Sequence, residues 1–141
     1  MSQAKPVLTL DLTWLGDLRF SGTAGGPAIV LDSAGEAGPS PVQSLALSLA
    51  GCMAMDVAHI LTKGRARIDA MTVRLVAERA PEEPRRIVAA EARFSLAADV
   101  SPDKVERAIA LSRERYCSVW HSMRQDIEFT TSFELTRPST A

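Results

Sequence analysis

The sequence predicts a single domain of the α+β class that extends over residues 1–141. Several segments alternate apolar and polar residues, as half-buried strands do, and two others begin with a serine and a proline and continue as helices. The hydrophobic content of 46% and the charged content of 23% are those of an ordinary globular domain with a core. Because 16 basic residues balance 17 acidic ones, we expect neither nucleic acid nor a membrane as a partner.

The N-terminal third is expected to form a β-meander. Residues 7–14 alternate apolar and polar side chains, which predicts a first strand. Two shorter strands are predicted over residues 19–23 and 28–32, because these runs flank Gly25 and Gly26, a pair suited to a tight hairpin turn. A loop rich in glycine and proline then ends the sheet.

A long helix is expected to follow, with clear signals at both ends. Ser40 can cap it, Pro41 suits its first position, and Gln43 stands where the second residue of a capping box belongs. Gly64 is a plausible stop. The apolar residues point in nearly every direction around the helix, so we expect it to be buried almost all round: Leu45, Leu47, Leu49, Met53, Met55, Val57, Ile60 and Leu61.

The second half of the chain is expected to contain a hairpin, two helices and a last strand. The order of elements is therefore β-β-β-α-β-β-α-α-β. The predicted elements are strands over residues 71–77 and 88–96, an amphipathic helix that begins at Ser101 and Pro102, a short helix within 116–123, and a final strand over 127–135.

The two cysteines, Cys52 and Cys117, are the candidate reactive groups. Residues 1–6 lack the layout of a signal peptide, and no apolar run approaches the roughly 18 residues that span a bilayer, so we expect a cytosolic protein. A permanent disulfide is uncommon in the reducing cytosol. The cysteines are then inert core thiols, metal ligands or catalytic thiols.

Cys52 lies on the only polar stripe of the predicted long helix. Burying unpaired polar groups costs about 1–3 kcal/mol each, so this stripe should face a site or an interface. The Asp56 carboxylate, one turn away, would oppose a Cys52 thiolate unless a cation such as Lys63 pairs with it. The alternative is that Cys52 is a small core residue and that other groups satisfy the stripe, whose members are Ser48, Cys52, Asp56, His59 and Lys63.

Cys117 has the more activating neighbours in the sequence. Arg115 precedes it, a helix is expected to begin here, and His121 follows one turn later. Each of these features lowers the pKa of a nearby thiol. The alternative is that Arg115 and His121 are solvated surface groups.

Zinc is a third interpretation, because cysteine and histidine are the ligands it prefers. Only Cys117 and His121 have suitable spacing. His59 lies two turns from Cys52, about 10 Å along a helix axis, which is too far for both to bind one ion. We expect no metal and no cofactor.

Two blocks of the sequence resemble the OsmC/Ohr family of thiol peroxidases. The first is GPSP at residues 38–41, followed by leucines and alanines and by AGCMAMDV at residues 50–57. The second is YCSV at residues 116–119. The expected order of strands and helices also fits the family, so the resemblance covers nearly the whole chain.

The resemblance implies an OsmC-like fold, in which a homodimer is intertwined, the central helices are buried, and the active sites lie at the subunit interface. It also implies a cycle in which Cys52 attacks an organic hydroperoxide and becomes a sulfenic acid, and Cys117 resolves it to a disulfide. A small dithiol or another thiol reduces that disulfide. Such a protein would serve in the response to oxidative stress.

The sequence departs from the family at two positions. The typical peroxidases carry a glutamate ten residues before the first cysteine, paired with an arginine at the end of the first hairpin strand. Val42 occupies the first position here, and residues 23–26 at the hairpin tip contain no arginine. Arg19 or Arg115 is the candidate replacement.

The sequence therefore predicts a thiol-dependent peroxidase that reduces organic hydroperoxides and, by the same chemistry, hydrogen peroxide. Because the activating pair is missing, a non-catalytic protein that senses redox state or binds a small molecule is the first alternative, and a metal-binding dimer is the second. Cys52 and Cys117 are the candidate catalytic residues, and the candidate supporting residues are Asp56, Arg115, His121 and Arg19.

Overall fold

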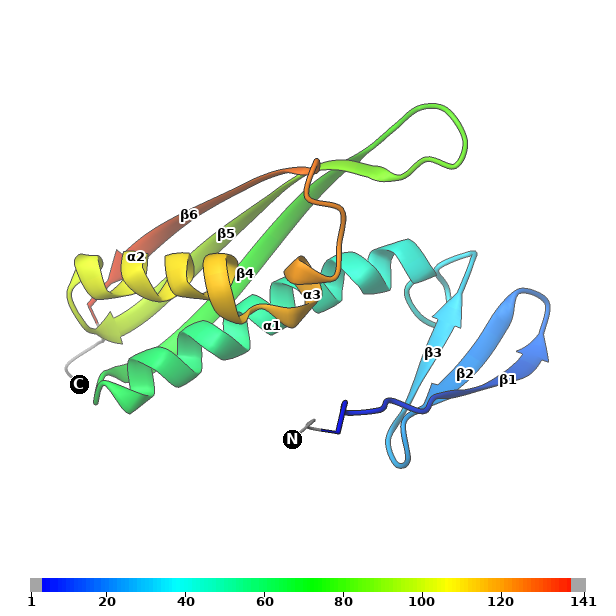
Figure 1. The fold of residues 1–141 in the computed structure, drawn as a ribbon, viewed down its shortest axis with the longest axis horizontal. Helices are drawn as coiled ribbons and strands as arrows, with labels where there is room; N and C mark the ends of the chain where they lie inside the picture. Colours follow the sequence, from blue (N-terminus) through cyan, green and yellow to red (C-terminus); the bar gives the residue numbers. More distant parts are fainter. Residues whose placement is uncertain (1–3, 138–141) are drawn as a thin grey trace. The chain divides into compact units, whose positions relative to one another are not determined.

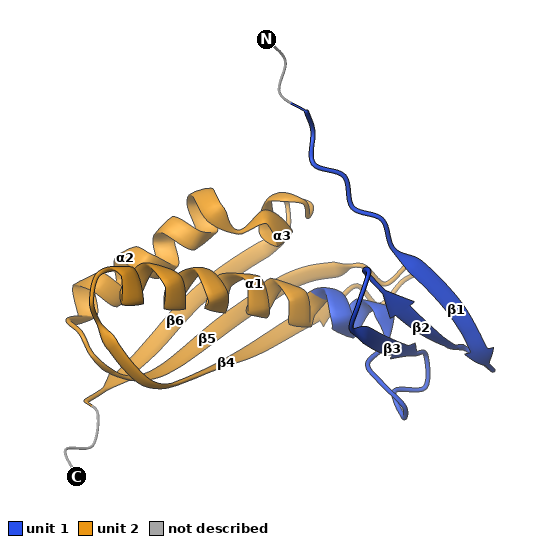
Figure 2. Cartoon of the chain, turned by 90° about the horizontal axis from the view of Figure 1, so that it is seen from below, with its two compact units in different colours: residues 1–45 blue, residues 46–141 orange. Residues whose placement is uncertain are grey.

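A computed structural model describes residues 4–137 and confirms the α+β class and the predicted order of strands and helices (Figure 1). The chain consists of two compact units, residues 1–45 and 46–141 (Figure 2), and the single-domain organisation stays a prediction. The elements are β1 (Asp11–Gly16), β2 (Arg19–Thr23), β3 (Ala28–Asp32), α1 (Pro41–Lys63), β4 (Arg67–Arg79), β5 (Ile87–Asp99), α2 (Pro102–Leu111), the π-helical turn η1 (Ser112–Tyr116), α3 (Ser118–His121) and β6 (Glu128–Thr136).

The first unit contains the predicted meander, an antiparallel sheet in the order β1-β2-β3. Strand β1 begins at Asp11, four residues later than expected at residue 7. Asp11 pairs with Thr23, the last residue of β2, so residues 7–10 extend past the end of the neighbouring strand. Several large apolar side chains of this unit are exposed in the single chain: Val7, Leu8, Leu10, Leu12, Trp14, Leu15, Leu18, Phe20 and Ile29.

Asp32 organises the loop that follows β3. Its buried carboxylate accepts hydrogen bonds from the backbone N–H groups of Ala34 (3.0 Å), Glu36 (3.2 Å) and Ala37 (2.9 Å). The bond from Ala37 leads the causes that lower the pKa of Asp32 to about 2, and Arg19 adds a hydrogen bond and a positive charge. The loop is thus held to the sheet by an ionised carboxylate.

Helix α1 begins and ends as predicted. The Ser40 N–H donates to Gln43 Oε1 (2.9 Å) and the Gln43 N–H donates to Ser40 Oγ (3.2 Å), which is a reciprocal capping box. Gly64 directly follows the last helical residue. The left-handed turn that reverses the chain is made by Arg65, whose φ is 68°.

The prediction that this helix is buried all round is wrong for the single chain. Only one face of α1 is buried, and Leu47 and Met55 on another face are 66% and 74% exposed. The helix also meets the length and composition criteria of a membrane span, with a mean hydropathy of 1.6 over 18 residues, which corrects the expectation that no apolar run is long enough. The buried residues of this helix lie in the second unit: Leu49, Ala50, Met53, Val57 and Leu61.

The second unit is a three-stranded sheet, β4-β5-β6, with helices α1 and α2 over one face (Figures 1 and 2). Strands β4 and β5 form the predicted hairpin, and β5 pairs with β6 in parallel. A parallel pair needs a crossover connection, which α2, η1 and α3 supply. Ala92, Phe94 and Leu96 of β5 are buried under the helices, whereas Arg93 and Ser95 on the other face are exposed.

The crossover differs from the prediction in two respects. Pro102 begins α2 as expected, but the Ser101 side chain makes no capping hydrogen bond. The expected short helix is limited to α3, and the unpredicted π-helical turn η1 lies between it and α2. The amphipathic character of α2 is confirmed, because Val105, Ala108 and Ile109 are buried and Ser112 is buried just after them.

Candidate active site

The fold brings the two cysteines together. Cys52 lies near the middle of α1 and is half-buried, and Cys117 lies in the crossover, between η1 and α3. Both are free thiols, and Cys52 is near enough to Cys117 to be one of the causes that raise the pKa of Cys117. The Cys52 Sγ is also 4.0 Å from the Ser118 Oγ, next in the chain after Cys117. Residues 65 positions apart in the sequence thus form one candidate thiol pair.

Cys117 is completely buried and held by its backbone. Its N–H donates to the Ser112 carbonyl oxygen (2.7 Å), which closes the π-helical turn. Its backbone is then extended, with φ −72° and ψ 98°, and its Sγ accepts a hydrogen bond from the Trp120 N–H (3.4 Å). The thiol is therefore the N-cap of the short helix α3.

The expectation that its surroundings lower the pKa of Cys117 is wrong. The pKa of Cys117 is raised to about 11, with burial as the largest cause and the neighbouring Cys52 as a smaller one. The Trp120 N–H opposes this shift but does not outweigh it. Burial favours the neutral thiol. The residues next to Cys117 in the sequence do not show that the thiol is buried.

The two groups expected to activate Cys117 point elsewhere. The Arg115 guanidinium lies over the ring of Tyr116, 5.6 Å from its centroid. The His121 Nε2 is 3.1 Å from the Arg113 carbonyl oxygen. Arg115 and His121 are both exposed, in agreement with the alternative that they are surface groups.

Asp56, one turn after Cys52, has a specific partner from another helix. Asp56 Oδ2 accepts a hydrogen bond from the Ser112 hydroxyl at 2.8 Å, and Ser112 is completely buried. The expected partner, Lys63, is not involved in this bond. Leaving such a buried hydroxyl unpaired would cost about 1–3 kcal/mol, so the pair has structural weight.

Ser112 and Ser118 are the site residues that sequence reasoning missed. Ser112 follows Val105, Ala108 and Ile109 on the apolar face of α2, and a lone hydroxyl on such a face indicates a buried polar partner. No comparable signal in the sequence marks Ser118, because its relevance depends on the packing of α3 against α1.

The C-terminal part of the polar stripe lines a cavity of about 630 Å³ in the second unit. Asp56, His59 and Lys63 contribute its ionisable groups. The other residues that line it come from the end of α1, the end of α2 and η1: Ile60, Gly64, Leu111 and Tyr116. The expectation that the stripe faces a functional site stays a prediction.

Cys52 and Ser48, the first two residues of the stripe, line a second cavity, of about 620 Å³. Apolar side chains from α1 and β4 dominate this cavity, so a hydrophobic molecule can approach the Cys52 thiol from this side. Its lining consists of Leu47, Ser48, Ala50, Gly51, Cys52, Ala54, Met55, Met71 and Val73.

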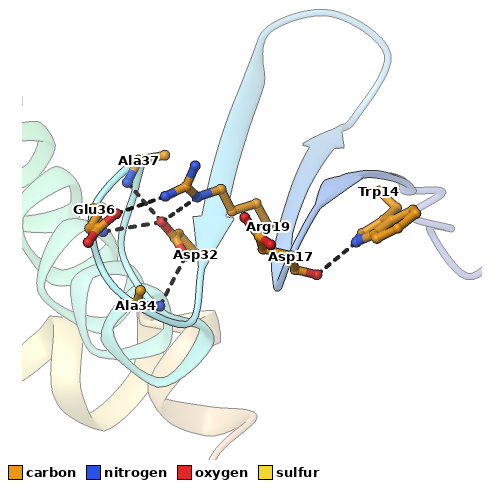
Figure 3. Close-up of polar contacts among 7 residues, drawn as sticks. All are labelled: Trp14, Asp17, Arg19, Asp32, Ala34, Glu36 and Ala37. Carbon is orange, nitrogen blue, oxygen red and sulfur yellow. Dashed lines mark hydrogen bonds and ion pairs between the residues drawn. The ribbon is translucent and has the colours of Figure 1, made fainter.

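Arg19 is engaged within the first unit (Figure 3). Its Nε lies 3.0 Å from Asp32 Oδ2 and its Nη2 lies 2.9 Å from Glu36 Oε2. Two carboxylates therefore balance its charge. Within residues 4–137, no three side chains of the His, Cys, Asp and Glu types converge as metal ligands would.

Comparison with known proteins places the chain in one family. Residues 33–132 match the family described as OsmC-like protein. The protein YhfA of Escherichia coli K12 is 35% identical over 125 residues, covering 86% of this chain and 93% of YhfA.

Two solved structures share the fold. A hypothetical protein from Aquifex aeolicus has a TM-score of 0.88 at 24% identity and covers 96% of this chain and all of its own. An organic hydroperoxide resistance protein OsmC from Legionella pneumophila has a TM-score of 0.68 at 11% identity, covering 94% of this chain and 99% of its own. The match over residues 33–132 includes both cysteines, and with this agreement in fold it shows that the chain belongs to the OsmC-like protein family.

Proposed function

We propose that this protein is a thiol-dependent peroxidase that reduces organic hydroperoxides with Cys52 and Cys117. The observation that carries the proposal is the contact between Cys52 and the segment that holds Cys117, where the Cys52 Sγ lies 4.0 Å from the Ser118 Oγ. Cys52 is half-buried beside an apolar cavity, and Cys117 is completely buried. The hydroperoxide resistance protein from Legionella pneumophila shares the fold and is consistent with this activity.

In the first step Cys52 acts as the nucleophile. Its thiolate attacks one peroxide oxygen of ROOH, a sulfur–oxygen bond forms, and the oxygen–oxygen bond breaks. The RO⁻ leaving group takes up a proton and departs as an alcohol, and Cys52 becomes a sulfenic acid. The apolar cavity beside Cys52 suits a substrate with a hydrocarbon tail.

In the second step Cys117 resolves the sulfenic acid. Its sulfur attacks the Cys52 sulfur, a disulfide forms, and the hydroxyl group leaves with the Cys117 proton as water. A small dithiol or another thiol then returns both cysteines to the reduced state. An incoming thiol attacks at Cys52, because Cys117 is completely buried and Cys52 is the more accessible sulfur.

We further propose a cytoplasmic homodimer. The exposed apolar side chains of α1, Leu47 and Met55, support a partner subunit that covers them. A cytoplasmic location suits two free thiols, since the cytosol keeps cysteines reduced.

A non-catalytic OsmC-like protein that senses redox state or binds a small molecule is the second candidate. One observation favours it: in the described part of the chain, the polar contact of the Cys52 Sγ is the Ser118 hydroxyl and not a cation. Arg19 is balanced by Asp32 and Glu36, so it is a poor replacement for the missing arginine.

Turnover of cumene hydroperoxide with a dithiol separates the two candidates. We expect the wild-type protein to reduce peroxide repeatedly and Cys52→Ser to lose this turnover. With a reductant that acts only on a disulfide, Cys117→Ser should consume one equivalent of peroxide and then stop. Equal rates in wild type and Cys52→Ser would refute the peroxidase.

A further inference from the structure

The first residue of the π-helical turn η1 is tied both to helix α1 and to Cys117. The Ser112 hydroxyl donates to Asp56 Oδ2 at 2.8 Å, and the Ser112 carbonyl oxygen accepts the Cys117 N–H at 2.7 Å. Asp56 stands one helical turn after Cys52. The two hydrogen bonds therefore form a continuous link from the turn of α1 that follows Cys52 to the backbone of Cys117.

The length of the π-helical turn determines where the Cys117 thiol points. The Ser112 N–H still bonds to the carbonyl oxygens of Ala108 and Ile109, as a continuing α-helix requires. The Cys117 N–H instead reaches back five residues, after which the backbone becomes extended. One residue in a helix corresponds to about 100° of rotation, so an ordinary α-helical turn here would direct Cys117 to another side.

The Ser112 hydroxyl does not do what a serine hydroxyl in a helix ordinarily does. Such a hydroxyl often bonds to the carbonyl of the preceding turn of its own helix. This one reaches across to Asp56 on a different helix, from a completely buried position beside Val105 and Ala108 on the apolar face of α2. The bond therefore fixes the beginning of η1 relative to α1.

We propose that Asp56 is a positioning residue, which holds Ser112 and, through it, keeps the Cys117 thiol within reach of Cys52. The proposal rests on the proposed function, because this position matters when Cys117 attacks the Cys52 sulfenic acid. In that step the sulfur–sulfur bond forms, the sulfur–oxygen bond breaks, and water leaves with the Cys117 proton.

A different role for Asp56 would be electrostatic, because a carboxylate one turn from Cys52 opposes a thiolate there. The two roles predict opposite results for Asp56→Asn. The asparagine side chain keeps a carbonyl oxygen that accepts from Ser112, but it carries no charge. If Asp56 acts by positioning Ser112, Asp56→Asn keeps its effect. If Asp56 acts by its charge, Asp56→Asn abolishes that effect.

The first experiment separates the two chemical steps. Reduced full-length protein is mixed with one equivalent of cumene hydroperoxide, the sulfenic acid is trapped with dimedone, and the disulfide is followed by mass spectrometry. We expect Asp56→Ala and Ser112→Ala to slow the disulfide step about tenfold relative to sulfenic acid formation, the factor that one lost buried hydrogen bond typically accounts for. Asp56→Asn should restore the ratio of the two rates to the wild-type value.

Two further variants sharpen the test. If Asp56 and Ser112 act through one bond, the double variant Asp56→Ala/Ser112→Ala is no slower than either single variant. Asp103→Ala, an acidic residue in the first turn of α2, is the matched control and should behave as wild type. Additive slowing in the double variant, or an Asp56→Asn variant as slow as Asp56→Ala, would overturn the positioning role.

A second measurement does not depend on peroxidase activity. In a glutathione redox buffer, the dithiol–disulfide equilibrium reports the effective concentration of the two thiols. We expect Ser112→Ala to lower it about tenfold and Asp56→Asn to leave it unchanged. An unchanged effective concentration in Ser112→Ala overturns the positioning role. If the disulfide forms in the glutathione buffer but the protein does not consume peroxide, only the proposed function is refuted.

Discussion

Cys52 and Cys117 have unlike surroundings although they lie side by side. Cys52 is half-buried and lines an apolar cavity, and Cys117 is completely buried with its Sγ bonded to the Trp120 N–H. A peroxide from solution therefore meets Cys52 first. The roles that the family resemblance assigns to the two cysteines agree with this difference in access.

The raised pKa of Cys117 gives a prediction for Cys52→Ser. This change removes the lesser cause of the shift and leaves burial, the larger one. We therefore expect alkylation of Cys117 by iodoacetamide to be slow at pH 8 and to rise toward pH values well above about 8.5, the pKa of a free thiol. The rate is measured against pH on the folded variant, with the unfolded variant as control.

The same shift has a consequence for stability at high pH. The unfolded thiol ionises first, and the folded thiol, with its pKa of about 11, follows only later. Up to the pKa of the unfolded thiol, the protonated Cys117 therefore makes its full contribution to the free energy of unfolding. That contribution is lost as the pH rises through the pKa of the folded thiol. If Cys117 titrates like a free thiol in folded Cys52→Ser, burial does not control the pKa of Cys117.

Local signals fix the ends of helix α1, and they can be tested against a matched site. Ser40→Ala removes the hydrogen bond to the Gln43 N–H and should lower the free energy of unfolding by about 1 kcal/mol. Ser101→Ala is the control, because the Ser101 side chain makes no capping bond. Urea denaturation measures both, and equal effects would contradict the role of the capping box.

The sequence predicted those elements that local chemistry determines. The capping box, the glycine after α1 and the alternation of the β4–β5 hairpin depend on residues within a few positions of one another, so the sequence alone predicts them. The turn η1 could not be predicted in this way, because the hydrogen bond from the Cys117 N–H to the Ser112 carbonyl oxygen depends on where Cys117 packs.

The candidate site was only partly predictable for the same physical reason. The contact between Asp56 and Ser112 joins residues 56 positions apart, and no local pattern encodes it. The pairing of Cys52 with Cys117 followed from the family resemblance. The direction of the Cys117 pKa shift was mispredicted, because its charged neighbours in the sequence turn away from the thiol and its burial was unknown.

Across the molecule, large apolar side chains are exposed in the single chain in both units, on strands β1 to β3 and on α1. Large exposed apolar patches often mark interaction surfaces, and we propose that a second copy of the chain covers these side chains. This is also what the OsmC-like family resemblance implies.

A charge on the exposed face of α1 tests the dimer. Met55 is 74% exposed, so Met55→Glu should leave the single chain folded and prevent association, because a carboxylate is costly to bury in an apolar interface. Light scattering coupled to size-exclusion chromatography gives the mass, and Thr130→Glu on β6, also exposed, is the control. A wild-type protein with the mass of one chain would refute the dimer.

We propose that Cys52 and Cys117 form one redox pair that a peroxide oxidises. The most direct test of this proposal is mass spectrometry of the reduced protein after one equivalent of cumene hydroperoxide. We expect a Cys52–Cys117 disulfide in the wild type and a trapped Cys52 sulfenic acid in Cys117→Ser. Two free thiols beside unconsumed peroxide would contradict it.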